Sequence, residues 1–116
     1  MLDAAISSST IANNIFYNPE GGKTIEASGF SGSITISNNI TMGSAMTDRS
    51  TIPAGMIMTA NQLATNPLFV GAPGDFRLQA GSPAIDAGLT LSLVLFDFDG
   101  RARPRGIAYD IGAHER

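Results

Sequence analysis

One phrase occurs twice in this chain. Residues 10–16 read Thr-Ile-Ala-Asn-Asn-Ile-Phe and residues 35–41 read Thr-Ile-Ser-Asn-Asn-Ile-Thr, so that Asn38 repeats Asn13 after 25 residues. A period of this length is typical of stacked-repeat folds, in which each unit buries its apolar face against its neighbours. The β-branched residues favour a strand. The repeat therefore predicts a coiled β-solenoid.

The Asn-Asn pair predicts a sharp corner at the same place in each copy. Asn adopts the left-handed backbone conformation more readily than most residues, and stacked Asn side chains form hydrogen-bonded ladders. We therefore take Asn13 and Asn38 as structural residues at equivalent corners. The flanking isoleucines are expected to share one interior, with Ile11 under Ile36 and Ile15 under Ile40. Two unrelated hairpin turns are the alternative.

The pattern changes after the second copy. Residues 44–55 read as a loop that leaves the stack, and residues 60–66 keep only a trace of the phrase. We therefore divide the single domain into stacked strands and loop over residues 1–65 and a closing segment over residues 66–116. In the closing segment Ser82, before Pro83, has the pattern of a helix N-cap, and Gly88 stands where a helix ends. These structural residues predict one short helical turn.

Composition limits the function. The chain has 116 residues, of which 43% are hydrophobic and 15% charged, as in a globular domain. A net charge of −3 argues against a general nucleic-acid binder. The absence of cysteine excludes disulfides and thiolate chemistry, and no apolar run is long enough for a membrane span. The N-terminal residues do not resemble a signal peptide, so we expect a cytoplasmic protein or a piece of a longer one.

Several motifs of the closing segment resemble the C-terminal end of bacterial right-handed parallel β-helix proteins, including pectate-lyase-like and choice-of-anchor surface proteins. They are Asn-Pro-Leu-Phe at 66–69, Asp-Phe-Arg-Leu at 75–78, Gly-Ser-Pro-Ala-Ile-Asp-Ala-Gly at 81–88, Asp-Phe-Asp-Gly at 97–100, and Asp-Ile-Gly-Ala-His-Glu at 110–115. The resemblance implies an all-β, short right-handed parallel β-helix. Proteins of this kind are usually longer and secreted, and many bind or cleave polysaccharide, with enzymatic chemistry on central coils that this chain mostly lacks.

Two aspartates are the candidate catalytic residues. Asp97 and Asp99 are two residues apart, so an extended backbone would place them about 7 Å apart, within the range of an acid–base pair in inverting glycoside hydrolysis. The same residues suit a turn in which the carboxylates pair with nearby arginines. We favour the turn. A calcium loop lacks its later ligands, and the single histidine, His114, does not by itself make a metal site.

Three arginines are the candidate ligand-binding residues. Arg101, Arg103 and Arg105 alternate with smaller residues, so that an extended strand places their guanidinium groups on one side. Such a row suits the carboxylates of an acidic polysaccharide. We favour internal pairing with the nearby acids. The aromatic residues are expected in the core, although an exposed Tyr or Phe would stack on sugar.

These observations predict a non-catalytic structural or binding module, associated with polysaccharide through the resemblance and without a cofactor or bound metal. A small polysaccharide lyase or glycoside hydrolase is the second hypothesis, and a remnant of a longer surface protein without a ligand is the third. Because the first repeat leaves an open strand edge, we expect a homo-oligomer formed through the N-terminal end.

Overall fold

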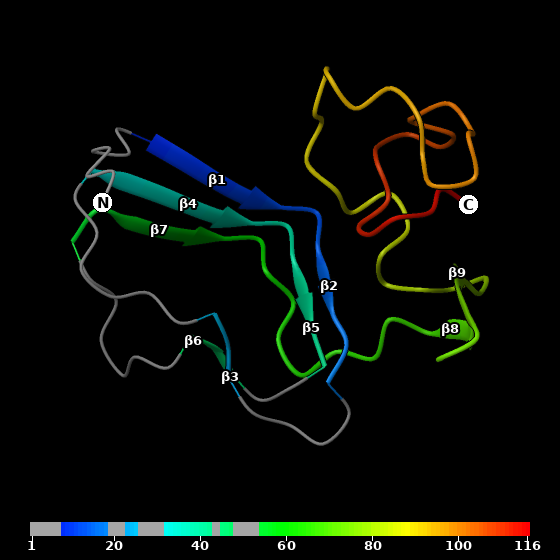
Figure 1. Ribbon diagram of the computed structural model, residues 1–116, viewed down its shortest axis with the longest axis horizontal. Coiled ribbons are helices and arrows are strands. Elements are labelled where there is room, and N and C mark those ends of the chain that lie inside the picture. Colours follow the sequence, from blue (N-terminus) through cyan, green and yellow to red (C-terminus); the bar gives the residue numbers. More distant parts are fainter. Residues whose placement is uncertain (1–7, 19–22, 26–31, 43–44, 48–53) are drawn as a thin grey trace, which may run out of the picture.

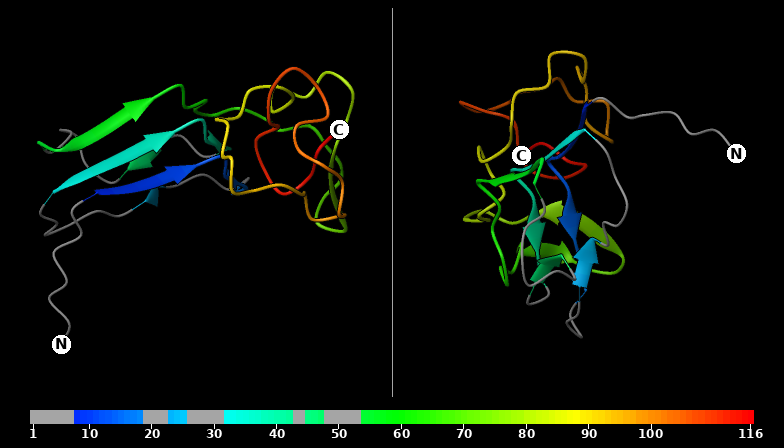
Figure 2. Two further views of the ribbon diagram at one scale, coloured as in Figure 1. Left: turned by 90° about the horizontal axis from the view of Figure 1, so that it is seen from above. Right: turned by 90° about the vertical axis from the view of Figure 1, so that its left-hand side faces the viewer.

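A computed structural model describes residues 8–18, 23–25, 32–42, 45–47 and 54–116. Three short strands form its largest sheet: β1 (Ser8–Ala12), β4 (Ser33–Ser37) and β7 (Met56–Thr59). They are parallel, in the order β1-β4-β7, and lie side by side in two views (Figure 1, Figure 2). Thr10 pairs with Thr35 and Ile11 with Ile36, so the register predicted by the repeated phrase is confirmed.

After this sheet the chain turns a corner into two smaller parallel pairs. β2 (Ile15–Phe16) pairs with β5 (Ile40–Thr41), and β3 (Lys23–Ile25) pairs with β6 (Ala45–Thr47). Figure 1 shows β2 and β5 running across the direction of the larger sheet. β6 falls within the loop predicted over 44–55, so that prediction is wrong for this stretch. The rest of that loop lies partly outside the described residues.

The corners are made by left-handed asparagines, as the sequence predicts. Asn13 has φ of 60° and Asn38 has φ of 53°, and the Asn13 N–H donates to the Asn38 carbonyl at 3.1 Å. The side-chain ladder, however, runs through the second asparagine of each pair. Asn14 Nδ2 donates to Asn39 Oδ1, and Asn39 Nδ2 donates to Asn61 Oδ1, both at 3.0 Å.

The ladder extends to a third copy of the phrase, although residues 60–66 keep only a trace of it. β7 pairs with β4, and Ala60 takes the left-handed conformation that Asn38 has in the second copy. Asn61 follows Asn39 after 22 residues rather than 25. The third copy therefore has the same corner with a shorter connection and different residues.

The apolar side chains form two clusters rather than one interior. The buried side chains of Ile36 and Met56 pack with Ile11 under the larger sheet. On the other side of the corner, Ile40 packs with Ile15 and Ile111. The expectation of a common interior is wrong because the left-handed residue at the corner redirects the chain, so that isoleucines four residues apart face different clusters.

The closing segment contains one pair of antiparallel strands, β8 (Phe69–Gly71) with β9 (Asp75–Leu78), and an isolated antiparallel bridge between Phe96 and Ala102. Residues 83–86 form turns, so the predicted helical turn is wrong. Gly88 is required for a different reason: a Cβ there would lie 2.7 Å from the Tyr109 carbonyl oxygen. Ser82 does not cap a helix, but it stabilises this turn: its Oγ accepts the Ala84 N–H at 3.1 Å and donates to the Pro67 carbonyl at 2.7 Å.

The predicted parallel β-helix is therefore wrong as a fold class. The described strands form four separate small sheets, one of them antiparallel, and these strands do not close into a solenoid. The irregular segment after β9 packs beside β2 and β5, because Ile111 belongs to the same cluster as Ile40 and the Gly112 N–H donates to Asn13 O. The result is a small all-β globule with stacked strands at one end (Figure 2).

The ladder gives the first testable prediction. Asn39 is fully buried, and its Nδ2 also donates to the carbonyls of Ile11 and Ser37. Asn39→Ala leaves these buried groups unpaired, so we expect the free energy of unfolding to fall by about 2–3 kcal/mol. Urea denaturation followed by circular dichroism measures this. Asn14→Ala, at the exposed end of the ladder, is the control with a smaller expected loss, and equal losses would contradict the assignment.

Candidate functional site

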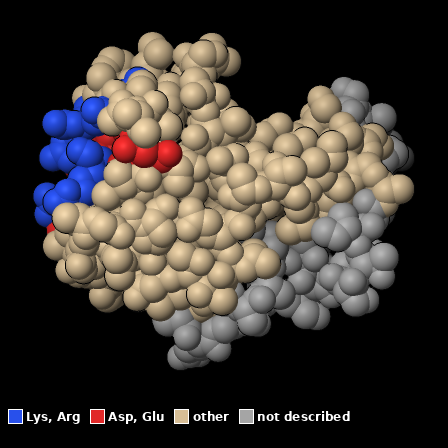
Figure 3. Space-filling view, turned by 180° about the vertical axis from the view of Figure 1, so that it is seen from behind, with Lys and Arg blue, Asp and Glu red and all other residues tan. Residues whose placement is uncertain are grey.

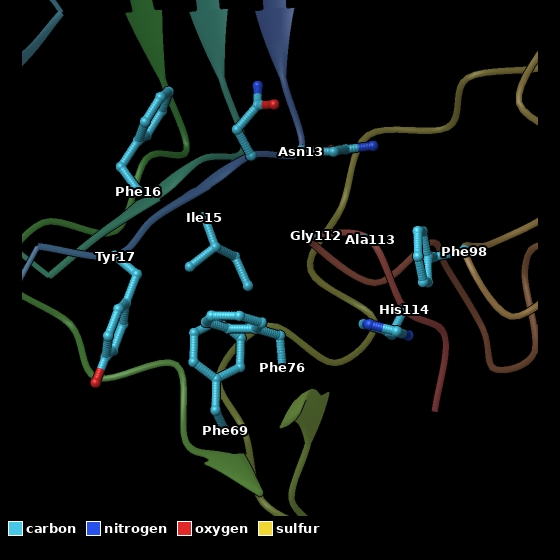
Figure 4. A pocket seen from close by; sticks show the side chains of 11 residues that line it. Asn13, Ile15, Phe16, Tyr17, Phe69, Phe76, Phe98, Gly112, Ala113 and His114 are labelled. Atoms are coloured by element: carbon cyan, nitrogen blue, oxygen red, sulfur yellow. The ribbon is translucent and has the colours of Figure 1, made fainter. Parts of the chain in front are cut away.

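A pocket of about 580 Å³ opens between the first repeat and the closing segment. Its volume lies in the range of small-ligand sites. Eleven residues line it, namely Asn13, Asn14, Ile15, Phe16, Tyr17, Phe69, Phe76, Phe98, Gly112, Ala113 and His114 (Figure 4). We call it the aromatic pocket, because five of these side chains are phenylalanine or tyrosine rings.

Three rings form the floor and one side of the aromatic pocket. The ring centroids of Phe69 and Phe76 are 5.1 Å apart at 89°, and those of Tyr17 and Phe69 are 5.4 Å apart. Such edge-on and tilted arrangements are the favoured ones for aromatic pairs. Tyr17 and Phe76 are 40% and 42% exposed, so each ring keeps surface available to a ligand.

The local backbone explains how these rings meet. Tyr17 directly follows β2. Phe16, the residue before it, lines the pocket and also packs against the cluster under the larger sheet. Phe69 and Phe76 come from the two strands of the β8–β9 pair. The side chain of Ile15 points down toward both phenylalanine rings (Figure 4).

The opposite wall belongs to the end of the chain. Phe98 and His114 contact each other edge to face, with centroids 5.5 Å apart, and lie across the pocket from Tyr17 (Figure 4). The Phe98 N–H donates to the Ala113 carbonyl at 2.7 Å, which fixes this wall. Phe98 is 81% exposed.

Gly112 makes the close approach of the two walls possible. Its φ is 110°, and a Cβ there would lie 2.9 Å from Cδ1 of Ile15. Only glycine fits this backbone and this contact without strain. Asn13 also ties the first repeat to the closing segment, since its Nδ2 donates to Leu89 O and its Oδ1 accepts the Leu89 N–H, both at 2.7 Å. Asn38 makes a similar bond to the Ala87 carbonyl at 2.9 Å.

The structure brings the candidate catalytic aspartates together with His114. One ligand atom from each of Asp97, Asp99 and His114 lies within 4.8 Å of the other two. The carboxylates are closer than the expected 7 Å because residues 97–100 form a turn, in which the Gly100 N–H donates to Asp97 O. His114 Nδ1 is 3.3 Å from Asp99 Oδ2.

Asp97 has the contacts of a structural carboxylate. It is buried, and its oxygens accept the N–H groups of Arg101 at 2.7 Å and Glu115 at 2.8 Å. Burial raises the pKa of Asp97, but these hydrogen bonds, a third from the Asp99 N–H and the charge of Arg101 outweigh it and leave the pKa below its ordinary value. A general acid needs the opposite shift.

The same three residues offer a divalent cation one histidine nitrogen and two carboxylates, a donor set that sequence reasoning did not assemble. A cation is already present beside them: the guanidinium of Arg101 lies 3.9 Å from Asp99 Oδ2. Both Asp97 oxygens also accept hydrogen bonds from backbone N–H groups. The carboxylates of the cluster therefore have partners without a metal ion.

The three candidate ligand-binding arginines have different environments. Arg103 is 6% exposed in its side chain and pairs with the buried Glu115 at 3.1 Å, the internal pairing we favoured. The Arg101 guanidinium pairs with the Asp99 carboxylate and also donates a hydrogen bond to the Glu115 carbonyl. The backbone N–H of Arg105 donates to Glu115 Oε2, while its guanidinium has no ion pair among the described residues.

Comparison with protein-family models, with curated proteins and with solved structures found no match for this chain. The resemblance to β-helix proteins therefore stays a prediction from the sequence. None of the described residues belongs to a helix long and apolar enough to cross a membrane.

The low pKa of Asp97 predicts a pH dependence of stability. A carboxylate whose pKa is lower in the folded than in the unfolded chain stabilises the fold above the unfolded pKa, and this contribution is lost as pH falls toward the folded pKa. We therefore expect the free energy of unfolding to decrease below about pH 4, near the ordinary value of 3.8. In Asp97→Asn, the side-chain NH₂ group replaces one carboxylate oxygen and cannot accept the backbone hydrogen bond there. We therefore expect the free energy of unfolding at neutral pH to fall by about 1–3 kcal/mol.

Urea titrations at neutral pH and at acid pH measure both effects. Asp99→Asn is the control, because Asp99 is exposed and holds no buried backbone donor among the described contacts. An unchanged pH dependence in Asp97→Asn would contradict the role assigned to this carboxylate.

Proposed function

We propose that this chain is a non-catalytic binding module whose aromatic pocket holds a saccharide. The observation that carries the proposal is the convergence of Tyr17, Phe69, Phe76 and Phe98 around one hollow of about 580 Å³. Sugar rings present C–H faces that pack on the electron-rich faces of aromatic rings. The polysaccharide association implied by the resemblance points to the same class of ligand.

The exposure of the rings supports binding over a purely structural role. Aromatic side chains that only fill a core are buried, whereas Phe98 is mostly exposed and Tyr17 and Phe76 are half-exposed. Polar groups stand beside them, as ligand sites require. Asn14 is exposed at the rim, and His114 has one ring nitrogen directed to Asp99, which leaves its second ring nitrogen for a ligand hydroxyl.

The second hypothesis, a lyase or glycoside hydrolase using Asp97 and Asp99, has weaker support. The pKa of Asp97 is lowered and its oxygens hold backbone N–H groups, so it is poorly suited to deliver a proton. The third hypothesis, a remnant without a ligand, predicts that the aromatic pocket binds no saccharide. The same binding experiment therefore separates it from our proposal.

Affinity electrophoresis in gels that contain a panel of neutral and acidic polysaccharides tests the proposal. We expect retardation by at least one polymer and a loss of about tenfold in affinity for Phe98→Ala, since one stacked ring contributes roughly 1–2 kcal/mol. Phe96→Ala is the matched control: Phe96 is also an exposed phenylalanine, two residues away, but it does not line the pocket.

Two outcomes would overturn the proposal. One is the absence of retardation by every polymer of the panel. The other is an equal loss in Phe96→Ala and Phe98→Ala, which would place binding outside the aromatic pocket.

Self-association through the N-terminal end is also part of our proposal. β1 is at the edge of its sheet, so its outer backbone groups have no strand partner among the described residues. Ile15 already packs against Gly112, so the edge that we expect to meet a second copy is Ser8–Ala12. Light scattering is expected to give a dimer, and a monomer at micromolar concentration would contradict it.

A further inference from the structure

We propose a second binding site, a groove for the oxyanion of a phosphate or sulfate ester, on the surface formed by Arg77, Arg101, Arg105 and Arg116. These four arginines line a hollow of about 470 Å³ together with Val70, Leu78, His114 and Glu115. We call it the arginine groove. It goes beyond the proposed function, since it takes a charged group rather than a sugar ring.

Four arginines gather here from segments far apart in the sequence. Arg77 is in β9, Arg101 and Arg105 lie in the segment that follows Asp97-Phe98-Asp99-Gly100, and Arg116 is the last residue. Figure 3 shows basic side chains gathered at one edge of the molecule, with acidic side chains beside them. The whole chain carries a net charge of −3, so this concentration of positive charge is local.

The neighbouring acids pair with only two of the four arginines that line the groove, Arg77 and Arg101. Glu115 is 1% exposed and is occupied by Arg103, which does not line the groove, and by two backbone N–H groups. Asp75 forms an ion pair with Arg77, and the hydrogen bonds from Arg77 lower the pKa of Asp75 to about 2. Asp99 is 3.9 Å from Arg101.

Two guanidinium groups therefore remain uncompensated. Arg105 is exposed and its side chain has no ion pair among the described residues. Arg116 is exposed as well, and its Nε only donates to the Leu78 carbonyl at 3.2 Å. These two guanidinium groups therefore keep N–H donors for the oxygens of a ligand.

A phosphate or sulfate ester fits this requirement by charge and shape. The guanidinium group presents a planar fork of N–H donors that binds two oxygens of such an oxyanion at once. The dianionic phosphate monoester offers three acceptor oxygens, enough for N–H donors from both Arg105 and Arg116. His114 lines both the arginine groove and the aromatic pocket, so the organic part of a bound ester has a path toward the aromatic rings.

Isothermal titration calorimetry at low ionic strength tests the site with sodium phosphate, sodium sulfate, glucose 6-phosphate and dextran sulfate, and with unsulfated dextran as the neutral probe. The inorganic salts represent a free ion, and the other charged probes represent an ester. We expect binding of the oxyanions that weakens with added sodium chloride. Arg105→Gln and Arg116→Gln are each expected to lose about tenfold in affinity, the effect of one charge-assisted hydrogen-bonded group.

Lys23→Gln is the matched control, because it makes the same change of net charge on β3, in a different sheet. An equal loss in Lys23→Gln would show a general charge effect and overturn the site, as would unchanged binding in Arg105→Gln with Arg116→Gln. Absence of binding by all four charged probes at millimolar concentration would overturn it too. Failure of this site leaves the saccharide proposal standing, because Phe98→Ala is tested with neutral polymers as well.

Discussion

The buried amide of Asn39 is the contact on which the parallel strands depend. A strand that turns a corner leaves carbonyl and N–H groups without a ladder partner, and burying them unpaired is costly. In the copy before it, the Asn39 side chain accepts the Asn14 N–H and donates to the Ile11 carbonyl. In the copy after it, the same side chain donates to Asn61 Oδ1. Because the same corner separates the two apolar clusters, it also directs β2 toward the closing segment and sets the near wall of the aromatic pocket.

The closing segment is ordered by buried carboxylates rather than by regular strands. Asp110 accepts the N–H groups of Asp86 and Arg116, and Glu115 accepts those of Asp110 and Arg105. These side chains take the place that neighbouring strands have in a sheet. An irregular chain held in this way can position Phe98 and His114 as firmly as a strand would, which is the condition for a preformed pocket.

The sequence predicts what depends on neighbouring residues and misses what depends on distant ones. The register of the first two copies and the left-handed asparagines follow from the repeated phrase alone. The third copy was missed because Ala60 replaces the corner asparagine and methionines replace isoleucines in the strand. The predicted helical turn was wrong because Gly88 is needed for close packing against the Tyr109 carbonyl and does not mark the end of a helix. The fold class was wrong because a strand register does not say whether the sheets close.

In the candidate site, too, the sequence predicts the local contacts and misses those between distant segments. That Arg103 pairs internally was expected from the nearby acids, yet nothing local distinguishes it from Arg105, two residues on. The aromatic pocket joins Tyr17, the β8–β9 pair and the last residues of the chain, and no spacing in the sequence predicts that meeting. The difference between 25 and 22 residues from one ladder asparagine to the next has a consequence. The ladder holds the corners in register across connections of unequal length, so the number of residues between two corners is not what aligns the strands.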